Sequence, residues 1–299
     1  MKPPPFAYHA PASLDEALHL LGQLENARVL AGGQSLMPML NMRFAQPDHV
    51  VDINGIADLA YIHRDGAWLE IGALTRQRDI EFSPLIAEIA PLLREAILQV
   101  GHRQTRNRGT LGGSLCHQDP AAEMVAVAAI YEAQVVIAGP QGRRTEPFAA
   151  FALDYMTTCL APDEMLVAVR YPLWPAKSGY CFTEYARRHG DFAIVSAGVL
   201  LQTDAGGGIV KASLALGGVG AVPLKLDAIA AELIGKPGSP DLFAQLAAGC
   251  ATIDAMEDAL ITATYRQQLA KTLLRRALET AYARATGQPL PRHAPRIAA

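Results

Sequence analysis

The sequence predicts an α+β protein with two domains, and three observations lead to that prediction. The chain has 299 residues, which is enough for two domains of ordinary size. In the first part, short apolar runs typical of strands alternate with helical patterns. After residues 172–179, a Pro- and Gly-containing segment that we interpret as a linker, three strand patterns precede three helical ones. Strands followed by helices are typical of an α+β domain.

The first part is expected to begin with a helix over residues 13–22, because Ser13-Leu14-Asp15-Glu16 is a capping-box pattern and Gly22 is a common helix stop. The next elements follow from apolar periodicity and from capping residues or prolines. We expect strands at residues 28–31, 50–53, 68–72, 134–138 and 165–171. We expect helices at 75–80 with Thr75 as cap, at 84–100 with a break at Pro91, and at 120–131 with Asp119 as cap.

The second part is expected to hold strands at 180–187, 193–203 and 209–216, the last two joined by the glycine-rich turn 204–208. Helices are expected at 226–234, 241–250 and 264–286. The tail 287–299, which is rich in Pro and Arg, is predicted to be loose.

Composition and charge exclude several classes of function. A formal net charge of -3 argues against nucleic acid or an anionic membrane as the main partner. The sequence has neither an apolar run long enough to span a membrane nor a signal-peptide core near Met1, so a cytoplasmic location is expected. Its four cysteines are widely spread and form no CxxC, which indicates reduced thiols and no metal site.

Two glycine-rich segments are the most informative local patterns. The first glycine segment is Ala31-Gly32-Gly33-Gln34-Ser35, and the second is Thr110-Leu111-Gly112-Gly113-Ser114. Glycine pairs let a ligand approach the backbone and allow positive φ, and clustered amides beside hydroxyl groups suit a phosphate. An ordinary tight turn is the alternative for each segment alone. Two such segments together favour a diphosphate.

Three further patterns have both a functional and a structural interpretation. Glu123 either compensates the dipole of its helix or accepts hydrogen bonds from nucleotide hydroxyls. The basic run His102, Arg103, Arg106 and Arg108 is either a solvated surface or a counter-charge for a diphosphate or an acidic partner. The corner Gly190-Asp191-Phe192 is either a turn with an aromatic anchor or one wall of a ligand site at a domain boundary.

Hydrolytic and thiol chemistry find little support. The sequence contains no GxSxG, because the pattern that starts with Gly33-Gln34-Ser35-Leu36 has Met37 where the second glycine is needed. Cys116 and His117 are adjacent in the chain, and adjacent side chains rarely face each other as a catalytic pair. We therefore assign no catalytic residue and no metal ligand.

Taken together and in this order, the two glycine segments, Asp119-Pro120-Ala121-Ala122-Glu123 and Arg187-Arg188-His189-Gly190-Asp191-Phe192-Ala193 resemble a known family. The family is the FAD-binding medium subunit of molybdenum hydroxylases, which include xanthine dehydrogenase and aerobic carbon monoxide dehydrogenase. The resemblance extends over residues 1–286.

The resemblance implies a fold. Residues 1–175 would form an FAD-binding domain of the vanillyl-alcohol oxidase (PCMH) type in two α/β subdomains, about 1–55 and 56–175. Residues 178–286 would form the C-terminal domain of the medium subunit, with three strands packed on helices.

The resemblance also implies site residues. Both glycine segments would hold the FAD diphosphate through backbone amides, Leu166 would pack near the flavin, and Phe192 would shield its ring. Ser114 departs from the family, which often has Asn there. The cofactor-binding residues implied in this way are Ala31, Gly32, Gly33, Gln34, Ser35, Leu36, Thr110, Leu111, Gly112, Gly113, Ser114, Glu123, Leu166, Asp191 and Phe192.

The function implied is electron transfer. A large partner subunit would carry the molybdenum cofactor, a small one would carry two [2Fe-2S] iron–sulfur clusters, and FAD on this chain would reduce NAD or a quinone. Homologous complexes suggest a dimer of heterotrimers. A stand-alone FAD oxidase of the same fold and a non-catalytic nucleotide-binding module are the alternatives.

Overall fold

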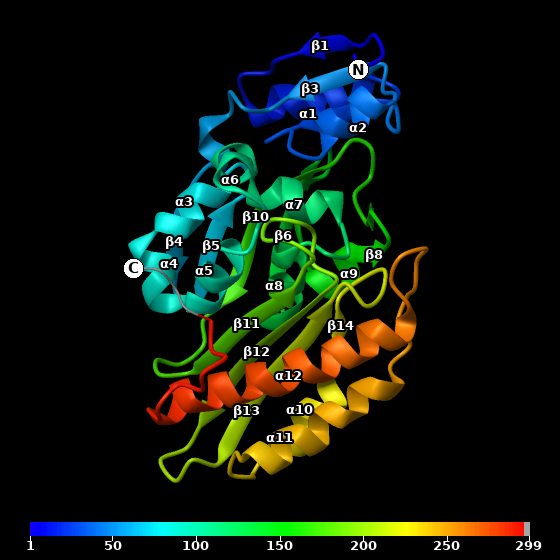
Figure 1. Ribbon diagram of the computed structural model, residues 1–299. Helices are drawn as coiled ribbons and strands as arrows, with labels where there is room; N and C mark the ends of the chain where they lie inside the picture. The colour runs from blue at the N-terminus through cyan, green and yellow to red at the C-terminus, as the bar shows by residue number, and fades with distance from the viewer. Residues whose placement is uncertain (296–299) are drawn as a thin grey trace.

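A computed structural model describes residues 1–295 of the chain. Figure 1 shows three layers in sequence order, with the N-terminal residues at the top and the C-terminal domain at the bottom. The mixed α+β character predicted from the sequence is confirmed.

The top layer is a small parallel sheet with the order β1-β3-β2. Its strands are β1 (Ala7–His9), β2 (Ala27–Leu30) and β3 (His49–Asp52), and its helices are α1 (Leu14–Gln23) and α2 (Leu36–Met42). Ser13 caps α1 by accepting a hydrogen bond from the amide of Glu16, as the capping-box pattern predicts. The helix continues through Gly22 and ends one residue later.

The middle layer is an antiparallel sheet with the order β4-β5-β10-β6-β7. Its strands are β4 (Ile62–Asp65), β5 (Trp68–Gly72), β6 (Gln134–Gly139), β7 (Gly142–Pro147) and β10 (Met165–Pro172). Its helices are α3 (Gln77–Phe82), α4 (Pro84–Ile89), α5 (Pro91–Ile97), α6 (Arg103–Arg108), α7 (Leu111–His117), α8 (Glu123–Tyr131) and α9 (Phe148–Phe151). A short hairpin pairs β8 (Ala152–Asp154) with β9 (Thr157–Thr158).

The bottom layer is a sheet with the order β11-β12-β13-β14, and α12 lies along one face of it (Figure 1). Its strands are β11 (Gly179–Tyr185), β12 (Val195–Thr203), β13 (Ile209–Gly217) and β14 (Leu224–Lys225). Its helices are α10 (Asp227–Leu233), α11 (Pro240–Ala247) and α12 (Ala263–Thr286). The sequence predicted three strands here; the fourth, β14, has two residues and therefore leaves almost no pattern to detect.

Helix α8 joins the middle and bottom layers. It packs on β12 and β13 as well as on elements of its own layer, and eight of its nine residues are buried. A helix covered on both sides needs apolar residues all round, which explains the uniformly apolar pattern of its sequence. The side chain of Ile130 on α8 fits against Gly198 of β12, where a Cβ would leave it no room.

A buried ion pair also ties these two layers together. The Glu95 carboxylate on α5 accepts a hydrogen bond from Arg284 on α12 at 2.8 Å and another from the amide of Phe182 on β11. The Glu95 side chain is only 1% exposed. The middle and bottom layers are therefore held together by polar contacts as well as by apolar packing.

Three local predictions need correction. The second glycine segment is the start of helix α7, with Thr110 as its N-cap, and is not a loop. Asp119 does not cap α8, which begins four residues later, because its carboxylate accepts a hydrogen bond from Ala121 within a turn. Thr75 does not cap α3, because its hydroxyl group bonds to the main chain of Tyr61.

The predicted loose tail lies partly outside the described residues, since 296–299 are not described. Within the described part, His293 contacts Glu279 on α12 at 3.3 Å.

Candidate functional site

A cleft of about 1010 Å³ runs between the layers and contains both glycine segments. It is also lined by Leu36, Glu123, Leu166, Asp191 and Phe192. The structure thus brings together on one cavity every residue assigned to the cofactor from the sequence, except Leu111. Leu111 has a fully buried side chain in the core of the middle layer and does not reach the cleft.

The first glycine segment is a turn between β2 and α2. Gly33 has φ +71, a conformation that favours glycine. Among the described residues, none accepts a hydrogen bond from the main-chain amides of Gly32, Gly33, Gln34 or Ser35. The Ser35 side chain makes no capping bond to α2 either. This segment therefore offers free donors on the wall of the cleft.

The second glycine segment uses its amides inside the chain. The amides of Leu111 and Gly112 donate to the carbonyl oxygens of Thr75 and Ala73, at 3.1 and 2.9 Å. The amides of Gly113 and Ser114 both bond to Thr110, one to its hydroxyl oxygen and one to its carbonyl oxygen. This differs from the expectation that both segments present open amides. The polar atoms that the second segment can offer to a ligand are therefore the hydroxyl groups of its side chains.

The glycines also have a packing role that the sequence did not reveal. A Cβ on Gly32 would lie 2.8 Å from the Cα of Gly109, and a Cβ on Gly112 would lie 2.6 Å from the Cβ of Ala73. Both distances are too short for real carbon atoms. These two glycines therefore let segments of the protein's own backbone approach one another.

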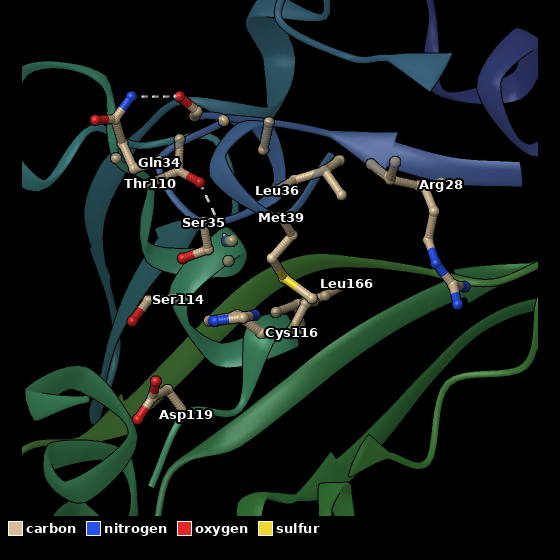
Figure 2. Close-up of a pocket in the computed structure, with 18 of the residues that line it drawn as sticks. Arg28, Gln34, Ser35, Leu36, Met39, Thr110, Ser114, Cys116, Asp119 and Leu166 are labelled. Atoms are coloured by element: carbon tan, nitrogen blue, oxygen red, sulfur yellow. Dashed lines mark hydrogen bonds between the residues drawn. The ribbon is translucent and has the colours of Figure 1, made fainter. Parts of the chain in front are cut away.

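The cleft has a polar part and an apolar part, as Figure 2 shows. The side chains of Ser35, Ser114 and Asp119 lie on one side of this view, and Arg28 lies at the opposite end. Between them lie Leu36, Met39, Cys116 and Leu166. A ligand with a charged portion and a flat apolar portion matches this division.

Glu123 is the one buried carboxyl group among the described residues that line the cleft. Burial raises its pKa to about 7, and the nearby Asp119 acts in the same direction, whereas Arg106 lowers it. Burial also raises the pKa of Glu184 on β11, and repulsion from Glu123 adds to that effect. Near neutral pH, the two carboxyl groups therefore hold at least one proton between them.

The basic run does not line the cleft. Arg106 is buried and forms an ion pair with Glu81 at 2.8 Å. The ring of His102 instead lies against Gly190, where a Cβ would collide with it. The counter-charge interpretation of this run is therefore wrong for Arg106, which stabilises α6 against α3.

The thiol of Cys116 lines the cleft but is not poised for nucleophilic chemistry. Burial raises its pKa to about 12, so the group stays protonated. Burial lowers the pKa of His117 beside it.

The Gly190-Asp191-Phe192 corner lines the cleft as well. Gly190 has φ +89, and the amide of Asp191 bonds to the carbonyl oxygen of Arg188 in a turn. The Phe192 ring is 70% exposed although it lines the cleft. An exposed aromatic ring on a cavity wall has a face available for a flat ligand.

Sequence reasoning missed Arg28 and Gln77, which both line the cleft. Gln77 Oε1 is buried and has no hydrogen-bond partner among the described residues. Neither residue belongs to a motif, and no pattern marks a single polar side chain within a strand or at a helix start. Only the position in the folded chain identifies them.

None of the helices within residues 1–295 combines the length and the apolar character needed to cross a membrane. In the same part of the chain, no three His, Cys, Asp or Glu side chains gather closely enough to hold a metal ion.

Comparison with family models matches nearly the whole chain. Residues 4–174 match the FAD binding domain in molybdopterin dehydrogenase. Residues 180–281 match the CO dehydrogenase flavoprotein C-terminal domain.

Individual relatives agree with the family models. The carbon monoxide dehydrogenase medium chain of Hydrogenophaga pseudoflava is 37% identical over 286 residues, which cover 95% of this chain and 99% of the relative. Caffeine dehydrogenase subunit beta of Pseudomonas sp. (strain CBB1) is 38% identical, over 94% of this chain and 96% of the relative. The structure of quinoline 2-oxidoreductase from Pseudomonas putida 86 superimposes with a TM-score of 0.92 at 35% identity, over 96% of this chain and the whole of that chain.

Proposed function

Because the chain belongs to the family of FAD-binding medium subunits of molybdenum hydroxylases, we propose that it carries electrons through FAD between partner subunits and an external acceptor. It is an oxidoreductase subunit, as are its relatives. The observation that best supports the proposal is the single cleft on which both glycine segments and the Gly190-Asp191-Phe192 corner meet.

The cleft fits FAD in three respects. Its volume of about 1010 Å³ is at the upper end of ligand sites, as a dinucleotide requires. The free amides of the first glycine segment suit a diphosphate, since main-chain N–H groups bind anions well. The apolar side chains of Leu36, Met39 and Leu166, which lie between the polar parts of the cleft, suit a flat ring.

We assign the diphosphate to the first glycine segment and the hydroxyl groups of Ser35 and Ser114. Leu166 and Phe192 would pack against the flavin ring, and Asp191 would offer it a hydrogen-bond acceptor. Glu123 would keep a proton at the edge of the cleft. The remaining residues of the proposed set are Ala31, Gly32, Gly33, Gln34, Leu36, Thr110, Gly112 and Gly113.

When bound, FAD supplies one-electron and hydride chemistry, which the chain's side chains do not have. The chain's own part is to hold the cofactor, to exclude water from the apolar section of the cleft and to set the charge around it. No residue of this chain is needed as acid or base in the oxidation of the organic substrate.

We place substrate oxidation on a large subunit with a molybdenum cofactor. A small subunit with two [2Fe-2S] iron–sulfur clusters would deliver electrons to this chain, which would pass them to NAD or a quinone, in a dimer of heterotrimers. Proteins named for carbon monoxide, caffeine and quinoline resemble this chain at 37%, 38% and 35% identity, respectively. That similarity supports selection of the substrate outside the chain. The cytoplasmic location expected from the sequence stays a prediction.

The test uses the purified full-length chain, alone and with the chains that co-purify with it. We expect the chain alone to take up FAD, seen as flavin absorbance, and to leave the flavin oxidised when organic substrates are added. The complex should bleach the flavin with its substrate.

Bleaching by the chain alone would favour a stand-alone oxidase. If neither preparation holds or takes up FAD, the non-catalytic module would be the better interpretation.

A further inference from the structure

Two polar side chains outside the cleft form a bridge behind the first glycine segment. Asn54 follows β3, and its Nδ2 donates to the carbonyl oxygen of Ala31 at 2.7 Å. Its Oδ1 accepts a hydrogen bond from Arg76 Nη2, also at 2.7 Å. The second nitrogen of the same guanidinium, Nη1, donates to the carbonyl oxygen of Arg108. Neither Asn54 nor Arg76 lines the cleft.

The bridge acts on the peptide groups that carry the free amides. The carbonyl of Ala31 and the N–H of Gly32 belong to one planar trans peptide, so they point in opposite directions. A donor that holds the Ala31 oxygen from behind therefore also fixes the direction of the Gly32 N–H. Gln34 Nε2 holds the Gly32 oxygen at 3.1 Å in the same way, which fixes the N–H of Gly33.

A hydrogen bond to a peptide oxygen also polarises the N–H of that peptide. Gly32 and Gly33 both line the cleft, and their amides have no acceptor among the described residues. The bridge thus orients and polarises the amides that would donate to an anion in the cleft. The bridge itself does not contact that anion.

The other end of the bridge sets the distance between the two glycine segments. The Arg108 carbonyl that Arg76 holds lies directly against Gly32, and the chain continues through Gly109 into the second segment. Arg76 pairs with Thr110 in an isolated β-bridge, so its own main chain fixes the same stretch. One side chain therefore ties the main chain of both segments together.

The chemistry of the two residues is specific. Asn54 must donate with one atom and accept with the other, which an aspartate cannot do. The carboxylate of Asp52 accepts from both the amide and Nδ2 of Asn54, and this fixes the rotamer. Arg76 uses two diverging nitrogens, and a lysine has only one ammonium group with which to replace them.

We propose that Asn54 and Arg76 are positioning residues of the FAD site, which aim the amides of the first glycine segment at the diphosphate by holding the main chain from the far side. This inference rests on the proposed function, because the anion it concerns is the diphosphate of FAD.

The test measures binding to the full-length apo-protein of FAD, of ADP as a diphosphate probe, and of riboflavin as a probe without phosphate. The variants are Asn54→Ala, Arg76→Ala and Arg76→Lys. Asn107→Ala and Arg64→Lys are matched controls, because both residues are exposed and lie outside the bridge. Thermal unfolding of each apo-protein shows whether it is folded.

We expect Asn54→Ala and Arg76→Ala to weaken the binding of FAD and of ADP by about tenfold or more, which is the effect of losing one or two hydrogen bonds. Riboflavin binding should stay within about twofold of wild type, as should every ligand in the two controls. Arg76→Lys should recover only part of the lost affinity, because it keeps the positive charge but lacks the two guanidinium nitrogens that bond to Asn54 and to the Arg108 carbonyl. It also serves as the mild variant if an alanine variant does not fold.

Unchanged FAD and ADP binding in folded Asn54→Ala or Arg76→Lys overturns the inference. So does an equal loss for riboflavin, which indicates a general defect of the fold, and so does full recovery by Arg76→Lys. If wild-type protein binds no FAD, it is the proposed function that fails, and the two failures are distinguishable.

Discussion

The two glycine segments share a pair of glycines and a final serine on the same cleft, yet they use their backbones in opposite ways. The first is a turn whose amides are free, and the second is the first turn of a helix whose amides are bonded within the chain. A pair of glycines in a sequence therefore does not tell whether the peptide groups there are open to a ligand. What decides is the partner of each amide, and that partner comes from distant residues such as Ala73 and Thr75.

The largest effect that tests this comparison is expected for Gly32→Val and Gly112→Val. Each new Cβ meets main-chain or Cβ atoms at distances that no rotamer relieves, at Gly109 for the first and at Ala73 for the second. We expect both variants to lose FAD and to lose roughly 3 kcal/mol or more of stability, the upper range for overpacking. The flavin-to-protein ratio and the thermal midpoint of the apo-protein are the measurements.

The matched comparison for this prediction is Gly33→Ala. A Cβ there meets only the flexible side chains of Met37 and Leu30, at 3.2 and 3.3 Å, and the cost is the positive φ. We expect about 1–2 kcal/mol, as for Gly66→Ala, which has φ +57 and open space around it. If Gly112→Val held its flavin, the packing role of the second segment would have to be abandoned.

The next effect concerns the proton bound by the Glu123 carboxyl group, which lies on the cleft. The folded-state pKa of Glu123 is raised to about 7, so the folded chain binds a proton that the unfolded chain releases at lower pH. The contribution of Glu123 to stability is complete below its unfolded pKa and is lost as the pH rises through about 7. The change amounts to at most about 3 kcal/mol.

Glu123→Gln should therefore reduce the pH dependence of urea unfolding between the ordinary pKa of 4.5 and the folded-state pKa of about 7. Asp119, Arg106 and Glu184 face the same carboxyl group and stay in place in this variant. Glu88→Gln, an exposed carboxylate on α4, is the control and should leave the slope unchanged. Equal slopes in wild type and Glu123→Gln would show that the carboxyl pair does not bind this proton.

The sequence predicted well the elements that depend on their own residues. Strand β5, the break at Pro91 and the buried helix α8 lie close to where apolar pattern and proline chemistry put them. Strand β7 (Gly142–Pro147) was not predicted, because it is an exposed edge strand with a charged sequence. Its strand conformation depends on pairing with β6.

The site was predicted as a set of residues but not as a set of contacts. The glycine segments and the Gly190-Asp191-Phe192 corner carry motifs, and the structure brings them to one cleft. Asn54, Arg76 and Gln77 carry none, because their roles depend on carbonyl groups and cavities that exist only after folding. The same reason explains the error at the second segment, where a helix start and a phosphate-binding turn share Thr, Gly and Ser.

The smallest effect is also the sharpest, because it predicts opposite outcomes for two hydroxyl groups on the cleft. Thr110 accepts a hydrogen bond from the amide of Gly113 at 3.1 Å and thereby caps α7. Thr110→Ala should cost about 1 kcal/mol of stability, the usual value of an N-cap, and should change FAD affinity little. Thr110→Ser keeps the hydroxyl group and should restore wild-type stability.

Ser35 makes no capping bond, so Ser35→Ala should leave the unfolding free energy within about 0.5 kcal/mol of wild type. Its hydroxyl group lies on the cleft beside the free amides. Loss of this hydroxyl group should weaken the binding of FAD by roughly five- to tenfold. Urea unfolding of the apo-proteins and FAD titration measure the two quantities separately. If Thr110→Ala weakened FAD binding as much as Ser35→Ala while stability held, the Thr110 hydroxyl group would itself contact the cofactor, and its assignment as a helix cap alone would be wrong.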